Sequence, residues 1–124
     1  MAQTVVTFGE IMLRLAPPGF ERFLQSPMFM ATFGGGEANV AVALAGFGIP
    51  ARYVTVLPPK HPIADAVISQ LRGFGVDTSK IVRAPGRMGV YYVESGANQR
   101  PSKVVYDRDY SAIALAKPGV INCD

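Results

Sequence analysis

The stretch FGGGEANVAVALAGFG, residues 33–48, joins three consecutive glycines to a long apolar segment. Residues 38–48 carry no charge and are rich in alanine, the strongest helix former. We therefore expect a helix over residues 37–47 that Gly48 ends, and its apolar character on all sides predicts that it is buried. The glycines in front of the helix allow another group to come close to the backbone there.

The segments around this helix predict an α/β fold. Residues 4–8 and 51–57 are rich in β-branched and aromatic side chains, which favours two buried strands. Apolar residues recur at helical spacing through residues 62–75, which predicts an amphipathic helix. Strands and helices that alternate with short connections are typical of a parallel sheet covered by helices.

A second pattern follows in the chain. Residues 89–94 and 103–108 are extended segments joined by the polar loop SGANQRPS, which predicts an antiparallel hairpin. Residues 11–16 continue as extended chain until the PPG at 17–19, and residues 28–33 suggest another strand before the glycines. Residues 111–124 show no clear strand and no complete helix.

Composition excludes several classes of protein. Only 17% of the 124 residues are charged, which argues against disorder. The net charge of +3 comes from scattered basic residues, so we expect no nucleic-acid partner. The first ten residues do not resemble a signal peptide, and the apolar run at 40–51 is too short and broken to cross a membrane. The single cysteine, Cys123, fits a reducing compartment, and we expect a cytoplasmic protein.

Three explanations compete for the glycines. Gly34 and Gly36 match the first two positions of a dinucleotide fingerprint, but Asn39 stands at the third, and no acidic residue follows about twenty positions later. Close packing of helix on sheet is a second explanation. The third is a ligand rich in hydroxyls or carrying a carboxylate, which the free N–H groups at the helix start can bind with help from the Asn39 amide.

Several motifs resemble those of the ribokinase-like (PfkB) carbohydrate kinases. GGGEANVAVALAGFG is similar to the first signature of that family, in which a Gly-Gly pair precedes a helix that bears an asparagine. The segments GEIMLRLAPPG, GVYYVE and KVVYDRDYSA resemble the 2-keto-3-deoxygluconate kinase branch. The resemblance covers residues 4–117.

The resemblance implies an architecture and a sugar site. It implies the N-terminal part of a kinase domain over residues 1–124, with a parallel-sheet core and a small antiparallel β lid formed by residues of about 11–33 and 89–108. The lid residues expected to bind a sugar acid are Tyr91, Tyr106, Asp107 and Arg108. The residues expected to line the pocket from the core are Gly35, Gly36, Glu37, Ala38 and Asn39.

Part of this site also follows from the residues themselves. Tyr106 and Arg108 are two positions apart and therefore point to the same side of a strand. A guanidinium matches the planar geometry of a carboxylate, and a neighbouring tyrosine can add a hydroxyl contact. Taken alone, these positions also fit an exposed charge and ordinary strand tyrosines.

The second signature of the family, Gly-Ala-Gly-Asp, is absent from these residues. By resemblance it supplies the catalytic base and the anion hole for ATP. We therefore assign no catalytic, cofactor-binding or metal-binding residue here, expect ATP and Mg only in a full-length enzyme, and predict that the chain alone is inactive. His61 has no partner suited to a metal site.

Alternatives to a sugar-acid kinase stay open. They are a kinase for a neutral sugar such as fructose or ribose, and a non-catalytic module for sugar binding or dimerisation. The expected partners are a small-molecule sugar acid and a second copy of the chain, paired through the lid. Neither nucleic acid nor a membrane is an expected partner.

Overall fold

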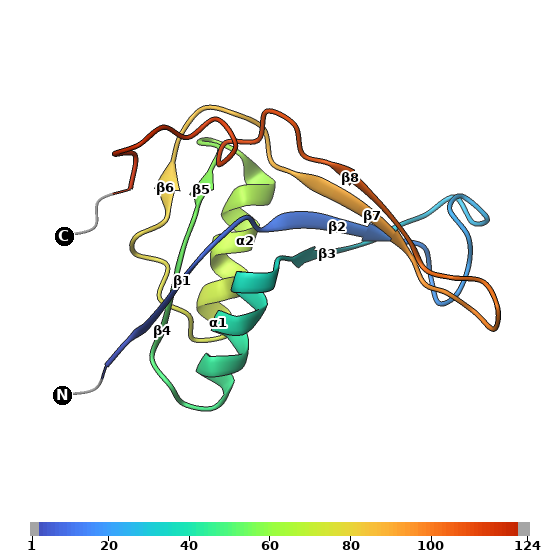
Figure 1. The fold of residues 1–124 in the computed structure, drawn as a ribbon, viewed down its shortest axis with the longest axis horizontal. Coiled ribbons are helices and arrows are strands. Elements are labelled where there is room, and N and C mark those ends of the chain that lie inside the picture. Colours follow the sequence, from blue (N-terminus) through green and yellow to red (C-terminus); the bar gives the residue numbers. More distant parts are fainter. Residues whose placement is uncertain (1–2, 122–124) are drawn as a thin grey trace.

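The computed structural model describes residues 3–121 and divides them between a helix-covered core and a projecting sheet (Figure 1). Cys123 lies outside the described residues. The helices are α1 (Gly36–Gly46) and α2 (Pro62–Gly73). The strands are β1 (Val5–Phe8), β2 (Met12–Ala16), β3 (Met30–Gly34), β4 (Ala51–Val54), β5 (Val56–Leu57), β6 (Val82–Arg83), β7 (Val90–Glu94) and β8 (Lys103–Asp107).

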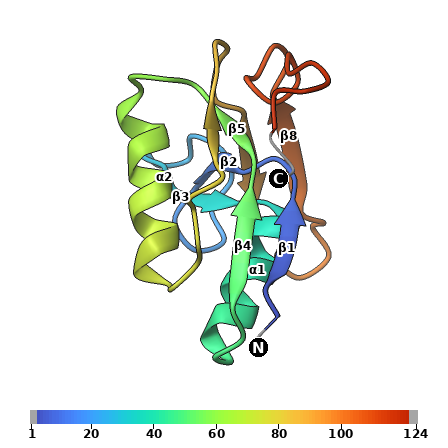
Figure 2. The same ribbon diagram turned by 90° about the vertical axis from the view of Figure 1, so that its left-hand side faces the viewer.

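The core contains two parallel strand pairs, β1 with β4 and β5 with β6. Both helices lie on the side of these strands that faces the projecting sheet (Figures 1 and 2). The single strand expected over residues 51–57 is divided at Thr55, because its two halves pair with different neighbours. No helix among residues 3–121 has the length and apolar character needed to cross a membrane.

Helix α1 forms within one residue of the expected range, at Gly36–Gly46, and Gly48 follows it with a left-handed φ of 78°. Its expected burial on all sides is wrong. Only Ala38 and Ala41 are buried, whereas Val40 is 49% exposed. The inner side of the helix packs against β1 and β4 and shares the core cluster with residues of α2, whereas the side that carries Val40 stays in contact with solvent.

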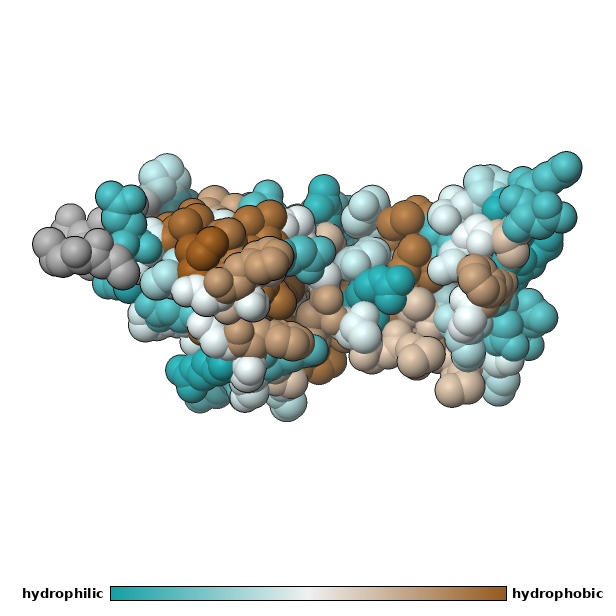
Figure 3. All heavy atoms as spheres, turned by 90° about the horizontal axis from the view of Figure 1, so that it is seen from below, coloured by the Kyte–Doolittle hydropathy of each residue, from teal (hydrophilic) through white to brown (hydrophobic). Residues whose placement is uncertain are grey.

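Strand β1 is also more exposed than its composition predicts. Val6 and Phe8 are 56% and 54% exposed. The strand pairs with β4 alone, and its outer face has no helix over it among residues 3–121. Apolar side chains therefore gather on the surface of the core end of the molecule (Figure 3).

The projecting sheet has four strands in the order β3-β2-β7-β8. The hairpin predicted from residues 89–108 is confirmed as the antiparallel pair β7 and β8, and β2 joins it in parallel. Directly paired residues share a face of a sheet. One face therefore carries the cross-strand row Thr32, Arg14, Tyr91 and Tyr106.

The hairpin tip holds the loop between β2 and β3. The backbone N–H of Phe23 donates to Oε1 of Glu94 at 2.8 Å, and the Arg100 guanidinium donates to the carbonyl of Phe20. Glu94 is only 2% exposed. Two residues of one hairpin thus fasten a loop that lies far from them in the sequence.

Candidate functional site

A cavity of about 200 Å³ lies where the four-stranded sheet meets the N-terminus of α1. It is lined by Met12, Gly34, Gly35, Gly36, Asn39, Tyr91 and Tyr106. The lining combines two elements that the sequence separates by about fifty residues, the glycine-helix segment and the β7–β8 hairpin. Five of the predicted site residues are therefore brought together around one space.

Close approaches explain two of the three glycines. A β-carbon on Gly34 would overlap the hydroxyl of Tyr91, and one on Gly35 would overlap the backbone carbonyl oxygen of Glu10. A β-carbon on Gly36 would meet nothing within 4 Å. The backbone thus needs glycine at Gly34 to admit a cavity side chain and at Gly35 to seat the helix on the chain that enters β2.

The start of α1 presents polar backbone to the cavity. Gly35 is the N-cap and supplies no side-chain cap, while its carbonyl accepts the N–H of Asn39 at 2.8 Å. The first N–H groups of a helix have no partner within the helix and lie at the positive end of its dipole. This end of the cavity can therefore bind hydroxyl or carboxylate oxygens.

The projecting sheet corresponds to the lid expected from the sequence. Its side of the cavity combines aromatic rings and a cation. Tyr91 and Tyr106 are directly paired across β7 and β8, with ring centroids 5.9 Å apart. The guanidinium carbon of Arg108 lies 5.0 Å from the Tyr106 ring centroid, so the two residues share a side, as their spacing predicts. Arg108 Nη1 also lies 3.8 Å from Oε1 of Glu10.

Four of the predicted site residues do not line the cavity, namely Glu37, Ala38, Asp107 and Arg108, although Arg108 lies beside it over the Tyr106 ring. Asp107 alternates with Tyr106 along β8 and pairs instead with Arg87 at 2.8 Å, and this hydrogen bond lowers the pKa of the carboxyl. The methyl group of Ala38 is buried in the core. The Glu37 carboxylate lies against Gly9, where a β-carbon would overlap it.

The crossing from core to lid is fixed by a buried phenol. Tyr53 is fully buried and donates to the carbonyl of Gly9 at 2.8 Å. Burial raises the pKa of Tyr53, and the nearby negative charges of Glu37 and Glu10 add to the effect. The phenol therefore stays protonated and keeps its hydrogen bond to the segment that leads into β2.

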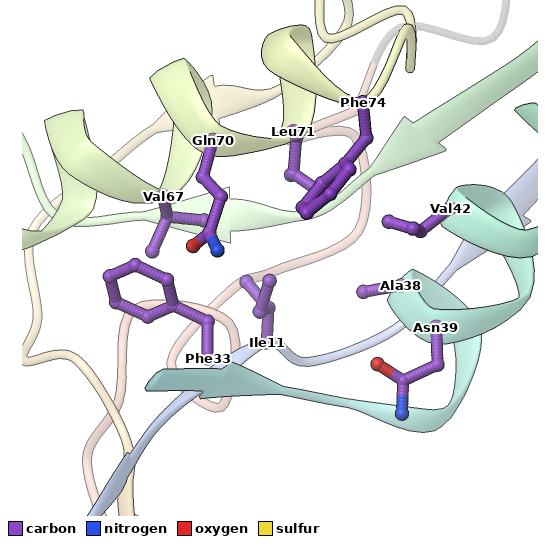
Figure 4. Close-up of a pocket in the computed structure, with 9 residues that line it drawn as sticks. All are labelled: Ile11, Phe33, Ala38, Asn39, Val42, Val67, Gln70, Leu71 and Phe74. Atoms are coloured by element: carbon purple, nitrogen blue, oxygen red, sulfur yellow. The ribbon is translucent and has the colours of Figure 1, made fainter. Parts of the chain in front are cut away.

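A second cavity of about 190 Å³ lies between the two helices (Figure 4). Most of its lining is apolar, with side chains such as Phe33, Leu71 and Phe74, and the amides of Asn39 and Gln70 are its polar groups. Asn39 lines both cavities. The first cavity is the better candidate site, because it alone of the two is lined by Tyr91 and Tyr106 and by the glycines Gly34–Gly36.

Sequence reasoning missed Met12, Gly34 and Glu10 as members of this region. Met12 and Gly34 face each other across β2 and β3, so strand register brings them together. His61, for which no metal role was expected, has a structural one: its Nδ1 accepts the N–H of Ala64 at 3.4 Å and caps α2. Within residues 3–121 no three His, Cys, Asp or Glu side chains are grouped so as to hold a metal ion.

Comparison with known proteins identifies the family. The family model described as pfkB family carbohydrate kinase matches residues 2–118. The chain therefore belongs to the pfkB family of carbohydrate kinases, and its mixed α/β fold is of the ribokinase-like type, as expected from the sequence.

Particular relatives act on 2-keto-3-deoxy sugar acids, as their names state. The chain is 37% identical over 124 residues to a 2-dehydro-3-deoxygalactonokinase of Haloferax volcanii, covering 100% of this chain and 39% of the relative. The crystal structure of a 2-dehydro-3-deoxygluconokinase from Thermotoga maritima matches with 54% identity and a TM-score of 0.92, over 96% of this chain and 36% of that one.

A third match is a PfkB family carbohydrate kinase from Listeria grayi. It shows 41% identity and a TM-score of 0.87, and the match covers 93% of this chain and 36% of that one. The chain thus spans little more than a third of the length of the relatives it matches.

Proposed function

We propose that this chain forms the sugar-binding part of an ATP-dependent kinase that phosphorylates 2-keto-3-deoxygluconate or a similar sugar acid. The observation that carries the proposal is the cavity between Gly34–Gly36 and the Tyr91–Tyr106 pair, with Arg108 stacked on Tyr106. The names of the Haloferax volcanii and Thermotoga maritima relatives support the choice of a keto-deoxy sugar acid.

Each part of the site has a role in this proposal. Arg108 binds the carboxylate of the sugar acid, because its guanidinium offers several N–H donors in one plane. Tyr91 and Tyr106 provide hydroxyl groups and an apolar surface for the carbon chain. Gly36, Glu37 and Ala38 act through their backbone N–H groups at the start of α1, and Asn39 adds its amide.

Asp107 acts indirectly in the same scheme. Its ion pair with Arg87 joins the end of β8 to the segment before β7, which helps to set the course of the chain that carries Arg108. We expect this exposed pair to make a small contribution to stability.

In this proposal, ATP and magnesium bind to a longer enzyme of which this chain is the N-terminal part. No aspartate here matches the catalytic base of the family, so we expect no phosphate transfer by residues 1–124 alone. Incubating the purified chain with ATP, Mg²⁺ and each sugar should give no more ADP than a blank without protein. ADP formation above the blank contradicts this expectation.

Binding of sugars tests the proposal directly. The chain has no tryptophan, and two of its five tyrosines line the cavity, so a ligand-dependent change in tyrosine fluorescence can report binding. We expect 2-keto-3-deoxygluconate to bind at least about tenfold more tightly than fructose or ribose, because a charge-assisted hydrogen bond contributes about 1.5–3 kcal/mol. Equal binding of the neutral sugars favours a neutral-sugar kinase, and the absence of any sugar binding by the folded chain contradicts the proposal.

We also propose that copies of the chain pair through the lid. The face opposite the cavity carries Val90, Tyr92 and Val105, and Val105 is 53% exposed. Apolar groups on an exposed sheet face favour association. We expect sedimentation to detect an oligomer that Val105→Lys dissociates, and a wild-type chain that stays monomeric at high micromolar concentration contradicts this assignment.

A further inference from the structure

Glu10 and Arg108 meet at the two places where the chain passes between core and lid. Glu10 lies between β1 and β2, and Arg108 directly follows β8. Their side chains are 18% and 51% exposed, respectively. The pair therefore joins a largely buried carboxylate to a cation that is open to solvent beside the cavity.

The contact between the two groups is loose. The 3.8 Å between Oε1 and Nη1 exceeds the roughly 2.7–2.9 Å of a charge-assisted hydrogen bond. The second oxygen of the carboxylate, Oε2, is buried and has no hydrogen-bond partner. Arg108 thus keeps its N–H donors available, while Glu10 holds an incompletely neutralised charge close to them.

Backbone packing keeps the Glu10 carboxylate in this position. A β-carbon on Gly89 would lie 2.5 Å from Oε2 of Glu10 and 3.1 Å from Cβ of Arg108, so the glycine leaves room for both. The backbone carbonyl of Glu10 lies against Gly35 at the start of α1. Glu10 is therefore held between the lid and the start of α1, which lines the cavity.

We propose that Glu10 is a resident counter-ion of Arg108 that competes with the carboxylate of a sugar acid. This inference rests on the proposed function. Without ligand, Glu10 attracts the guanidinium and keeps it over Tyr106. When an acid binds Arg108, the Glu10 charge repels the incoming carboxylate, whereas a neutral sugar meets no such repulsion. Glu10 therefore limits the preference of the site for acids.

The test compares one acid with its neutral counterpart. The ligands are 2-keto-3-deoxygluconate and 3-deoxyfructose, which differ at C1, where the second has a hydroxymethyl group in place of the carboxylate. For Glu10→Gln we expect the dissociation constant of the acid to fall about three- to tenfold, and that of 3-deoxyfructose to stay unchanged. The matched control is Glu21→Gln, a carboxylate with a buried oxygen outside the site, which should change neither constant.

A double-mutant cycle isolates the pair. In an Arg108→Gln background there is no guanidinium to compete for, so the gain in acid affinity from Glu10→Gln should shrink to the part that comes from direct repulsion between the two carboxylates. If the glutamine variant does not fold, as judged by its thermal melt, Glu10→Met removes the charge without burying an amide and should give the same result.

The outcomes separate this inference from the proposed function. A wild type that does not prefer the acid contradicts the proposed function. A wild type that prefers the acid, with Glu10→Gln leaving acid binding unchanged or weaker, overturns the counter-ion role alone. Equal changes for both ligands also overturn it, because they indicate a structural role.

Discussion

The hydroxyl of Tyr91 lies where a β-carbon on residue 34 would stand, so the absence of a side chain at Gly34 makes room for a side chain of the lid. Gly34 ends β3 just before α1, and Tyr91 is in β7. The relationship answers why the chain places glycines ahead of an apolar helix. Gly34 and Gly35 admit groups from elsewhere in the molecule, the Tyr91 hydroxyl and the Glu10 carbonyl.

Gly34→Ala should displace the Tyr91 ring from the cavity. We expect about a tenfold loss of sugar-acid affinity and a destabilisation of roughly 1–3 kcal/mol, as for other overpacked sites. Fluorescence titration and thermal unfolding measure the two effects. The variant Gly34→Ala/Tyr91→Phe removes the colliding hydroxyl and should recover stability but not affinity. Unchanged affinity in Gly34→Ala contradicts the assignment of Tyr91 to the site.

Arg108→Ala should weaken the acid by roughly thirty- to hundredfold, because a hydrogen bond to a charged group contributes about 2–3 kcal/mol. Arg108→Lys should restore only part of the affinity, since an ammonium lacks the planar fork. A neutral sugar of the same shape should bind wild type and variants alike. If the variant binds the neutral sugar as much more weakly as it binds the acid, the arginine stabilises the lid and does not bind the carboxylate.

Glu94→Ala should release the loop between β2 and β3. The change leaves the partly buried Phe23 N–H without its acceptor, for an expected loss of about 1–2 kcal/mol in the free energy of unfolding. Glu94→Gln keeps an acceptor oxygen and should cost less. Hydrogen exchange at the Phe23 amide checks the mechanism, and unchanged protection in Glu94→Ala argues against this anchor.

Two glycines near the end of α1 should respond in opposite directions to alanine. Gly46 lies in the helix, and a β-carbon added to it would meet nothing within 4 Å, so Gly46→Ala should stabilise by about 0.5–1 kcal/mol. Gly48 has a φ of 78°, so Gly48→Ala should destabilise by about 1 kcal/mol. Chemical denaturation of both variants measures the contrast, and two shifts of the same sign contradict the helix end described here.

Asp77 should make stability depend on pH in the acid range. Hydrogen bonds from Ser79 and then Arg52 lower the pKa of its carboxyl from 3.8 to about 2 in the folded chain. Its contribution is therefore fully present above about pH 4 and is lost as the pH falls through about 2. The group is 37% exposed, so we expect only on the order of 1 kcal/mol after solvent screening.

The test of this linkage is Asp77→Asn. The variant should be less stable than wild type at pH 7 and nearly equal to it near pH 2, as measured by urea unfolding. A difference that is the same at both pH values assigns the effect to packing and not to the charge.

Local sequence patterns predicted where helices and strands form better than they predicted which faces of these elements are buried. The alanine-rich composition of α1 and the two tyrosine-bearing strands of the hairpin follow from intrinsic preferences, and both elements form where expected. The burial of β1 could not be predicted in the same way. The sequence shows that Val6 and Phe8 are apolar, but they are exposed in the structure. Whether a face of the strand is buried depends on which elements pack over it.

In the candidate site, too, some residue positions follow from local sequence patterns and others depend on the folded chain. Alternation along β8 was sufficient to place Tyr106 and Arg108 together, and the same rule applied to Asp107 would have placed it on the opposite side. Glu10 carries no local signal at all. Its position beside Arg108 results from two crossings between core and lid that are distant in the sequence, and only the folded chain shows them.

The side chain of Asn39 lines two cavities at once. It borders the space assigned to the ligand and also the space between α1 and α2. A shorter residue there enlarges both spaces at once, and a bulkier one narrows both. We therefore expect a substitution at Asn39 that tightens helix packing to change, at the same time, the size of the ligand that the proposed site can admit.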